Sequence, residues 1–289
     1  MNIELIANLS YILSAIFFIF GLKMLGSPAT ARRGNLLSSL GMLIAIVAGL
    51  TAQGIVDYKI IAGGILVGAI IGSLAARLVE MTSMPEMVAL FNGSGGAASL
   101  LVGWATLYGG DVSSFTAFTI LLAILIGGVT LTGSIVAYGK LSETINSAAV
   151  VFTGQRIVNS LVLIGILVAG YLFCVEPSPN NQWLYVTLAL ALLLGVMVVI
   201  PIGGADMPVV ISLLNSYSGI AACAAGFAID NNILIVAGSL VGAAGIILTN
   251  IMCKAMNRSL SNVLFSGFAS VSSEETVVEG EIKPISVED

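Results

Sequence analysis

Histidine is absent from all 289 residues, and charged residues make up only 9% of the chain. Without histidine, the chain lacks the most common metal ligand and the side chain that usually titrates near neutral pH. Catalytic sets of the Ser/His/Asp or Cys/His type are excluded for the same reason. Because soluble domains contain about 25% charged residues, the low charge content also excludes an ordinary soluble domain.

Cysteine is scarce as well, with three residues that show neither metal-ligand spacing nor a disulfide framework. Basic residues form no patch or run, which excludes a nucleic-acid-binding surface. The net charge of −5 arises largely at the C-terminal end, where six of the 15 acidic residues fall within 274–289. We therefore predict no metal site and no nucleic-acid partner.

Apolar side chains dominate what is present: 58% of the chain is hydrophobic, and the mean hydropathy is +1.08. The apolar residues form long runs and do not alternate over ten-residue segments, which favours helices over a barrel. The sequence predicts an all-α integral membrane protein with about nine transmembrane helices, each near the 20 or so residues that a bilayer requires. The predicted spans are Ile3–Leu22, Asn35–Gln53, Tyr58–Ala76, Pro85–Leu107, Phe115–Tyr138, Val158–Cys174, Trp183–Ile200, Met207–Ala228 and Asn232–Cys253.

Basic residues are distributed unevenly over the loops between these spans. Nine of the ten fall on one side, which the positive-inside rule assigns to the cytoplasm, so we expect the N-terminus outside and the C-terminus inside. Residues 1–268 are predicted to form the transmembrane domain, and the polar, acidic residues 269–289 a cytoplasmic linker. The nine residues are Lys23, Arg32, Arg33, Arg77, Lys140, Arg156, Lys254, Arg258 and Lys283.

Two of the predicted spans share a pattern that recurs after 123 residues. Met84-Pro85 matches Met207-Pro208, and the later asparagines and glycines of the two spans also match. Both copies enter from the predicted cytoplasmic side, so the repeat is parallel, and spans three to five and seven to nine are candidates for related triplets. The matched pairs are Asn92 with Asn215, Gly96 with Gly219 and Gly103 with Gly226.

Several polar side chains are expected at membrane depth. Asn92 follows Pro85 by seven residues, which places it about 10 Å inside the helix end at 1.5 Å per residue. Converging amides and hydroxyls from Asn92, Asn215, Ser134 and Ser216 could hold a file of water along which a proton hops. The alternative is that the two asparagines are only interhelical hydrogen-bonding groups, worth about 0.6 kcal/mol each.

Charged residues stand at the cytoplasmic mouths of three spans. Glu86, Asp206 and Arg258 suit either a docking surface for a cytoplasmic domain or simple anchoring at the membrane interface. The segment Gly93–Gly96 follows no strand and lacks the lysine of a phosphate-binding loop, so it is not interpreted as a nucleotide site. No catalytic site for covalent chemistry is visible.

Four segments closely resemble the membrane portion of the β subunit of proton-translocating NAD(P) transhydrogenase. They read M-T-S-M-P-E-M-V-A-L-F-N-G at Met81–Gly93, L-T-G-S-I-V-A-Y-G-K-L at Leu131–Leu141, P-I-G-G-A-D-M-P-V-V-I-S-L-L-N-S-Y-S-G at Pro201–Gly219 and C-K-A-M-N-R-S at Cys253–Ser259. The resemblance extends from the first span to Phe268. It implies an enzyme complex in which hydride passes between NAD(H) and NADP(H) while a proton crosses the membrane.

The resemblance also implies cofactors and partners. NAD and NADP would be bound in the full complex and none by this chain. An NADP(H)-binding domain, absent here, would follow the linker, and α subunits would bring the NAD(H)-binding domain and further transmembrane helices. The family implies a dimer of αβ units in the bacterial inner membrane.

The resemblance assigns roles to individual residues. Asn215 and Ser134 match polar positions of the proton path, and Asp206 and Arg258 match charged positions facing the NADP(H) domain, with the motif acid Glu86 beside them. Asn92 departs from the family, since many relatives carry a histidine there. Either a helix of the α subunit supplies a titratable group, or protons pass by water alone. Because gating requires a group that changes charge, we expect the first, with a histidine of the α subunit at the same depth.

Two other classes of function remain open on the residues alone. Duplicated polar spans are typical of secondary transporters and ion channels, which would bind a solute or ion by themselves. An inert membrane scaffold for soluble domains is the third class, and it predicts that Asn215→Leu leaves proton coupling intact.

Overall fold

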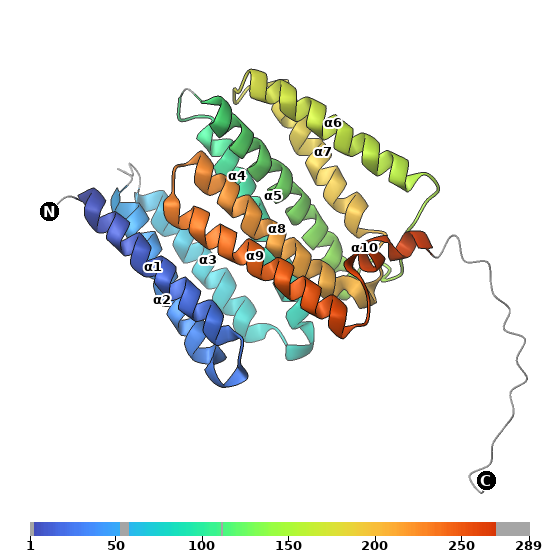
Figure 1. The fold of residues 1–289 in the computed structure, drawn as a ribbon, viewed down its shortest axis with the longest axis horizontal. Coiled ribbons are helices and arrows are strands. Elements are labelled where there is room, and N and C mark those ends of the chain that lie inside the picture. Colours follow the sequence, from blue (N-terminus) through green and yellow to red (C-terminus); the bar gives the residue numbers. More distant parts are fainter. Residues whose placement is uncertain (1–2, 53–57, 111, 270–289) are drawn as a thin grey trace, which may run out of the picture.

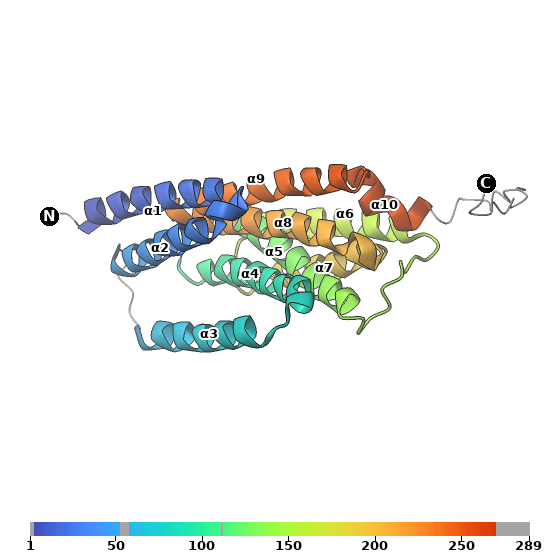
Figure 2. The same cartoon turned by 90° about the horizontal axis from the view of Figure 1, so that it is seen from below.

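The computed structural model describes residues 3–52, 58–110 and 112–269, which form a bundle of long helices (Figures 1 and 2). The α1–α2 hairpin and α3 lie on one side, α6 and α7 on the other, and α4, α5, α8 and α9 between them. The elements are α1 (Ile3–Leu25), α2 (Pro28–Ala52), α3 (Tyr58–Leu78), η1 (Met81–Ser83), α4 (Met84–Thr106), α5 (Ser114–Leu141), α6 (Gln155–Val175), α7 (Gln182–Val199), η2 (Gly204–Asp206), α8 (Met207–Ala228), α9 (Asn232–Ala255) and α10 (Leu260–Ala269).

The predicted all-α fold is confirmed, and the described residues contain no strand. Over those residues, nine helices are long and apolar enough to cross a membrane, in agreement with the predicted number. The helices extend past the predicted spans at their basic ends: α2 begins at Pro28 instead of Asn35, and α5 includes Lys140. Long basic side chains can reach polar surroundings from within a helix, so they do not have to end it. The orientation across the membrane stays a prediction.

The centre of the bundle is formed by α5 and α8. In the most apolar windows of these helices, 56% and 67% of the residues are buried, which makes them the two most enclosed spans. Each packs on the other and on α4, while α7 covers α5 and α9 covers α8. By contrast, no residue of α3 is buried, and Figure 2 shows this helix set apart from the rest. Several polar residues of α4, α5 and α8 are buried at this centre, among them Asn92, Ser134 and Ser216.

Matched glycines bring the central helices close together. A Cβ on Gly96 of α4 would lie 2.8 Å from the Gly127 carbonyl oxygen of α5. A Cβ on Gly219 of α8 would lie 2.5 Å from the Gly242 nitrogen of α9. Each copy of the Met-Pro motif is also preceded by a short 3-10 helix, η1 or η2. These similarities lie in the pairs α4–α5 and α8–α9, and the repeat itself, like the match of whole triplets, stays a prediction.

The helix α10 was not foreseen from the sequence. Asn262 N donates to Ser259 Oγ at 3.1 Å, which caps the helix, and Val263 is fully buried. Leu260 and Leu264 pack with Val263 against the apolar cluster at the ends of α8 and α9. Only Ala269 of the expected linker 269–289 belongs to α10, and the remainder lies outside the described residues.

Candidate functional site

The Asn92 side chain joins three of the central helices. Its Nδ2 donates to Ser134 Oγ of α5 at 2.9 Å, and its Oδ1 accepts from Ser218 Oγ of α8 at 2.8 Å. Asn92 is 8% exposed and Ser134 is fully buried, so these bonds form with little competition from solvent. We call Asn92, Ser134 and Ser218 the amide–hydroxyl network.

The local sequence explains how α4 and α5 approach closely enough for this network. A Cβ on Gly93 would lie 3.2 Å from Ser134 Cβ, closer than most real side chains tolerate. The helix runs without interruption from Met84 to Thr106, so its glycines do not unwind it, and Gly93 and Gly96 allow close packing against α5. Pro85 stands in its first turn, where the missing N–H costs no helical hydrogen bond.

Asn215 and Ser216 lie next to the network without entering it through their side chains. The Asn215 side chain is exposed and makes no hydrogen bond to any described residue, although its carbonyl accepts from Ser218 Oγ at 2.8 Å. Ser216 is fully buried and donates to the Gly242 carbonyl of α9 at 2.5 Å. The structure therefore brings Asn92 and Ser134 together as expected, and it adds Ser218.

The Ser218 hydroxyl has two acceptors within reach. Its one hydrogen can go to Asn92 Oδ1 or to the Asn215 carbonyl, and both lie at 2.8 Å. A hydroxyl in this position can change acceptor by rotating about one bond. Ser218 is not among the residues that the sequence assigned to the proton path, although its spacing of three residues from Asn215 places both on one helix face.

A further hydroxyl lies one turn from Ser134 on α5. Thr130 Oγ1 is buried and has no hydrogen-bond partner among the described residues. Buried polar atoms are generally satisfied, so a hydroxyl of this kind is suited to binding water. It extends the polar lining of the α4–α5 interface beyond the amide–hydroxyl network.

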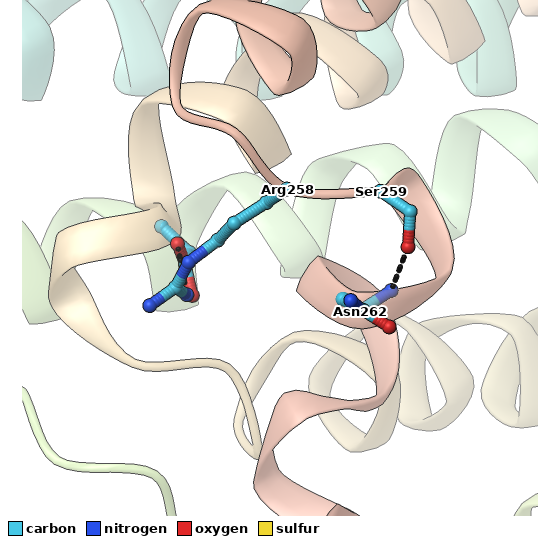
Figure 3. Close-up of polar contacts among 4 residues, drawn as sticks. Arg258, Ser259 and Asn262 are labelled. Atoms are coloured by element: carbon cyan, nitrogen blue, oxygen red, sulfur yellow. Dashed lines mark hydrogen bonds and ion pairs between the residues drawn. The ribbon is translucent and has the colours of Figure 1, made fainter.

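Asp206 and Arg258 form an ion pair between the start of α8 and the end of α9. Figure 3 shows Arg258 beside Ser259 and Asn262 at the start of α10. Nη1 of Arg258 lies 2.9 Å from Oδ1 and 2.7 Å from Oδ2 of Asp206. The Asp206 side chain is 6% exposed, whereas that of Arg258 is 48% exposed. One end of the pair is thus buried and the other is open to solvent.

A helix-ending motif fixes the backbone of Arg258. Asn257 has a φ of 53°, a left-handed conformation that asparagine tolerates better than most residues. Its N–H donates to the Lys254 carbonyl at 3.0 Å, and the N–H of Arg258 donates to the Cys253 carbonyl at 2.9 Å. These two hydrogen bonds terminate α9, and the Ser259 side chain then caps the start of α10.

Glu86 does not take part in the ion pair of Asp206 and Arg258. It is half-buried in the first turn of α4 and has no ion pair with any described residue. A carboxylate in this turn interacts favourably with the positive end of the helix dipole. Its position agrees with the interfacial anchoring that was one of the two alternatives for the charged residues.

The chemical capacity of these side chains is limited to hydrogen bonding and charge pairing. The described residues include no group of three or more histidine, cysteine, aspartate or glutamate side chains that could hold a metal ion. The three cysteines are free thiols. Amides and hydroxyls can orient water, but none of them titrates near neutral pH.

Comparison with known proteins identifies relatives over nearly the whole chain. A family described as "NAD(P) transhydrogenase beta subunit" matches residues 7–289. The NAD(P) transhydrogenase subunit beta of Rhodospirillum rubrum is 40% identical over 270 residues, which cover 90% of this chain and 58% of the relative. A sequence of the same description from a named strain of that species gives the same values. The chain thus spans little more than half the length of these relatives.

Proposed function

Since the chain belongs to the NAD(P) transhydrogenase beta-subunit family, we propose that its helices form the proton-translocating membrane domain of that enzyme. Proton passage through this domain is coupled to hydride transfer between NAD(H) and NADP(H), which are bound on other domains of the complex. The observation that carries the proposal is the amide–hydroxyl network of Asn92, Ser134 and Ser218, which ties α4, α5 and α8 together.

The glycine-rich segment of α4 does not fit a nucleotide. A Cβ at Gly93 or Gly96 would already meet α5, at 3.2 Å and 2.8 Å, so the phosphates of a dinucleotide have no room there. The segment also lies within a helix that is apolar enough to cross the membrane. We therefore place NAD and NADP on other parts of the complex and assign the described residues to proton passage and coupling.

Within the proposed path, protons move between water molecules that the amide–hydroxyl network orients. Thr130 extends the lining along α5, and Asn215 presents an exposed amide beside Ser218. A polar side chain facing lipid is costly, so the exposed Asn215 favours contact with a helix of another subunit. We propose that this helix belongs to the α subunit and carries the histidine that Asn92 replaces in this chain.

Asp206, Arg258 and α10 are proposed to connect the path to the NADP(H)-binding domain. The ion pair lies half in solvent at the point where α9 gives way to α10, so a docked domain can reach Arg258. Glu86 is proposed to contribute at the same face from the start of α4. The full assembly is proposed to be a dimer of αβ units in a bacterial inner membrane.

The experiment that tests the proposal is a simultaneous record of hydride transfer and internal pH. The complete complex is sealed in vesicles and given NADPH with an NAD analogue, with and without an uncoupler. A pH change in step with hydride transfer, abolished by the uncoupler, is the expected result. Hydride transfer without any pH change would overturn the proposal and favour a scaffold. A pH response that requires another solute would favour the transporter class.

A further inference from the structure

Lys140 is a buried cation that the proposed path does not use. It stands in the last turn of α5, and only 1% of the residue is exposed. Its Nζ donates to the carbonyls of Ala148 at 2.8 Å, Ile200 at 2.7 Å and Ile202 at 2.7 Å. An ammonium group has three hydrogens, so all three are used. Because a buried charge is costly unless it is well bonded, this arrangement demands a structural reason.

The three carbonyls belong to two connecting segments and not to α5 itself. Ile200 caps the end of α7 and Ile202 follows it, so Lys140 sits at the negative end of that helix. Ala148 lies in the connection between α5 and α6. Lys140 thus ties the end of α5 to both connections at once.

Ser147 reinforces the same junction. Its hydroxyl donates to the Lys140 carbonyl at 2.8 Å, and its own carbonyl accepts from the Gly204 N–H at 2.8 Å. A cavity of about 560 Å³ opens beside these residues and is lined by Gly203, Gly204 and Ala205 as well. Ile202 is buried in the apolar core, whereas residues 203–205 border this open space and depend more on hydrogen bonds than on packing.

The segment 200–206 ends at Asp206, which belongs to the ion pair with Arg258. Gly204–Asp206 forms η2, and Asp206 then meets Arg258. The helix α5 carries Ser134 of the amide–hydroxyl network in its middle and Lys140 at its end. One continuous helix therefore joins the centre of the proposed path to the segment that places Asp206.

From this geometry we infer that Lys140 is a positioning residue for coupling, which rests on the proposed function. By holding residues 200–206 against α5, it keeps Asp206 in contact with Arg258. A displacement of α5 at the amide–hydroxyl network is thereby passed to the start of α10. Loss of Lys140 therefore uncouples the amide–hydroxyl network from the Asp206–Arg258 ion pair, although the side chains of both remain in place.

A first experiment measures amide hydrogen exchange in the complete complex in lipid. For Lys140→Met, exchange in residues 200–206 and 256–264 is expected to be faster by roughly tenfold or more, the scale for losing hydrogen bonds to a charged group. Exchange around Asn92 is expected to stay unchanged. The control is Lys254→Met, which removes an exposed lysine near the end of α9 and should alter neither region.

A second experiment measures protons moved per hydride transferred by the same variants in sealed vesicles. The ratio is expected to fall at least twofold in Lys140→Met, to recover partly in Lys140→Arg, and to stay at the wild-type value in Lys254→Met. Unchanged exchange together with an unchanged ratio would overturn the inference, and so would uniformly faster exchange over all helices.

Two further arrangements keep the test decisive. If Lys140→Met does not assemble, Ser147→Ala removes only the hydroxyl bond to the Lys140 carbonyl and must produce the same changes in smaller degree, or the inference fails. If the wild-type complex moves no protons, the proposed function fails. In that event the exchange data still show whether Lys140 holds residues 200–206.

Discussion

A carboxamide both donates and accepts hydrogen bonds, and the Asn92 side chain uses both functions within the bundle. It differs from an imidazole in one respect that matters for proton transfer: it has no protonation equilibrium near neutral pH. Asn92 can orient a chain of hydrogen bonds, but it cannot hold the transferred proton. At the residue scale, the path proposed here requires a titratable group from another chain.

Removing the Ser134 hydroxyl should reduce proton translocation. Ser134→Ala leaves the Asn92 amide without an acceptor in a buried place, and an unsatisfied donor costs about 1 to 3 kcal/mol. If that cost falls on the transfer step, the translocation rate drops roughly tenfold or more. The measurement is the initial rate of internal pH change in vesicles. Ser99→Ala is the matched control, because Ser99 bonds only within its own helix; an equal loss there would contradict the prediction.

The ion pair of Asp206 and Arg258 should contribute little to stability. Arg258 is half exposed, and pairs open to solvent are worth about 0 to 1 kcal/mol. A double-mutant cycle with Asp206→Asn and Arg258→Gln, followed by thermal unfolding in detergent, should give a coupling energy in that range that shrinks with added salt. A coupling energy of several kcal/mol, insensitive to salt, would contradict the prediction, because it would show that the pair is shielded from solvent.

Side-chain identity predicted part of the site and not all of it. Asn92 and Ser134 could be chosen because polar residues in apolar runs are conspicuous, and their hydrogen bond is present in the structure. The donor role of Ser218 depends on how α8 is rotated against α4, which no single sequence pattern specifies. The burial of Lys140 was missed because a lysine at the end of a span normally reaches solvent.

At the scale of helices, close contacts between backbones replace the large side chains that fill soluble cores. Gly219 and Gly238 let α8 and α9 approach until a Cβ on Gly238 would lie 2.5 Å from the Cys223 nitrogen. Small residues at such contacts are typical of helix packing in lipid. The partner helix that each glycine meets became evident only from the fold.

An added methyl group at such a contact should separate the helices. Gly219→Ala places a Cβ against the Gly242 backbone, which cannot move away as a flexible side chain can, and overpacking costs about 1 to 3 kcal/mol. The midpoint of thermal unfolding in detergent should fall accordingly. Gly95→Ala is the control, since a Cβ there meets no atom within 4 Å. Equal destabilisation by both variants would show that the contact with α9 does not govern the effect, because helix propensity alone favours alanine over glycine at both positions.

The beginnings and ends of elements were harder to predict than their existence. Apolar runs located all nine long helices, yet α10 escaped notice because a short helix leaves no membrane-length signal. Its cap at Ser259 and the buried Val263 are visible only once the helix is docked. The uninterrupted course of α4 through its glycines also depends on packing against α5.

Two surfaces of the bundle are left uncovered by the helices of the described residues. None of the residues of α3 is buried, and a Cβ added to any of its glycines would meet no atom within 4 Å. Asn215 adds an exposed amide within α8. We propose that helices of the α subunit cover these surfaces. Membrane spans and family are readable from composition and motifs, whereas assembly is a property of other chains.

Whether the network around Asn92 lies on the proton path is best tested by the number of protons moved per hydride transferred in Asn92→Leu. The side chains are similar in size, but leucine neither donates nor accepts a hydrogen bond. Ser216→Ala serves as the comparison, since the Ser216 hydroxyl bonds to α9 and not to the network. We predict that the ratio falls to near zero in Asn92→Leu, with the unfolding midpoint retained, and stays near the wild-type value in Ser216→Ala. A wild-type ratio in Asn92→Leu would contradict the account.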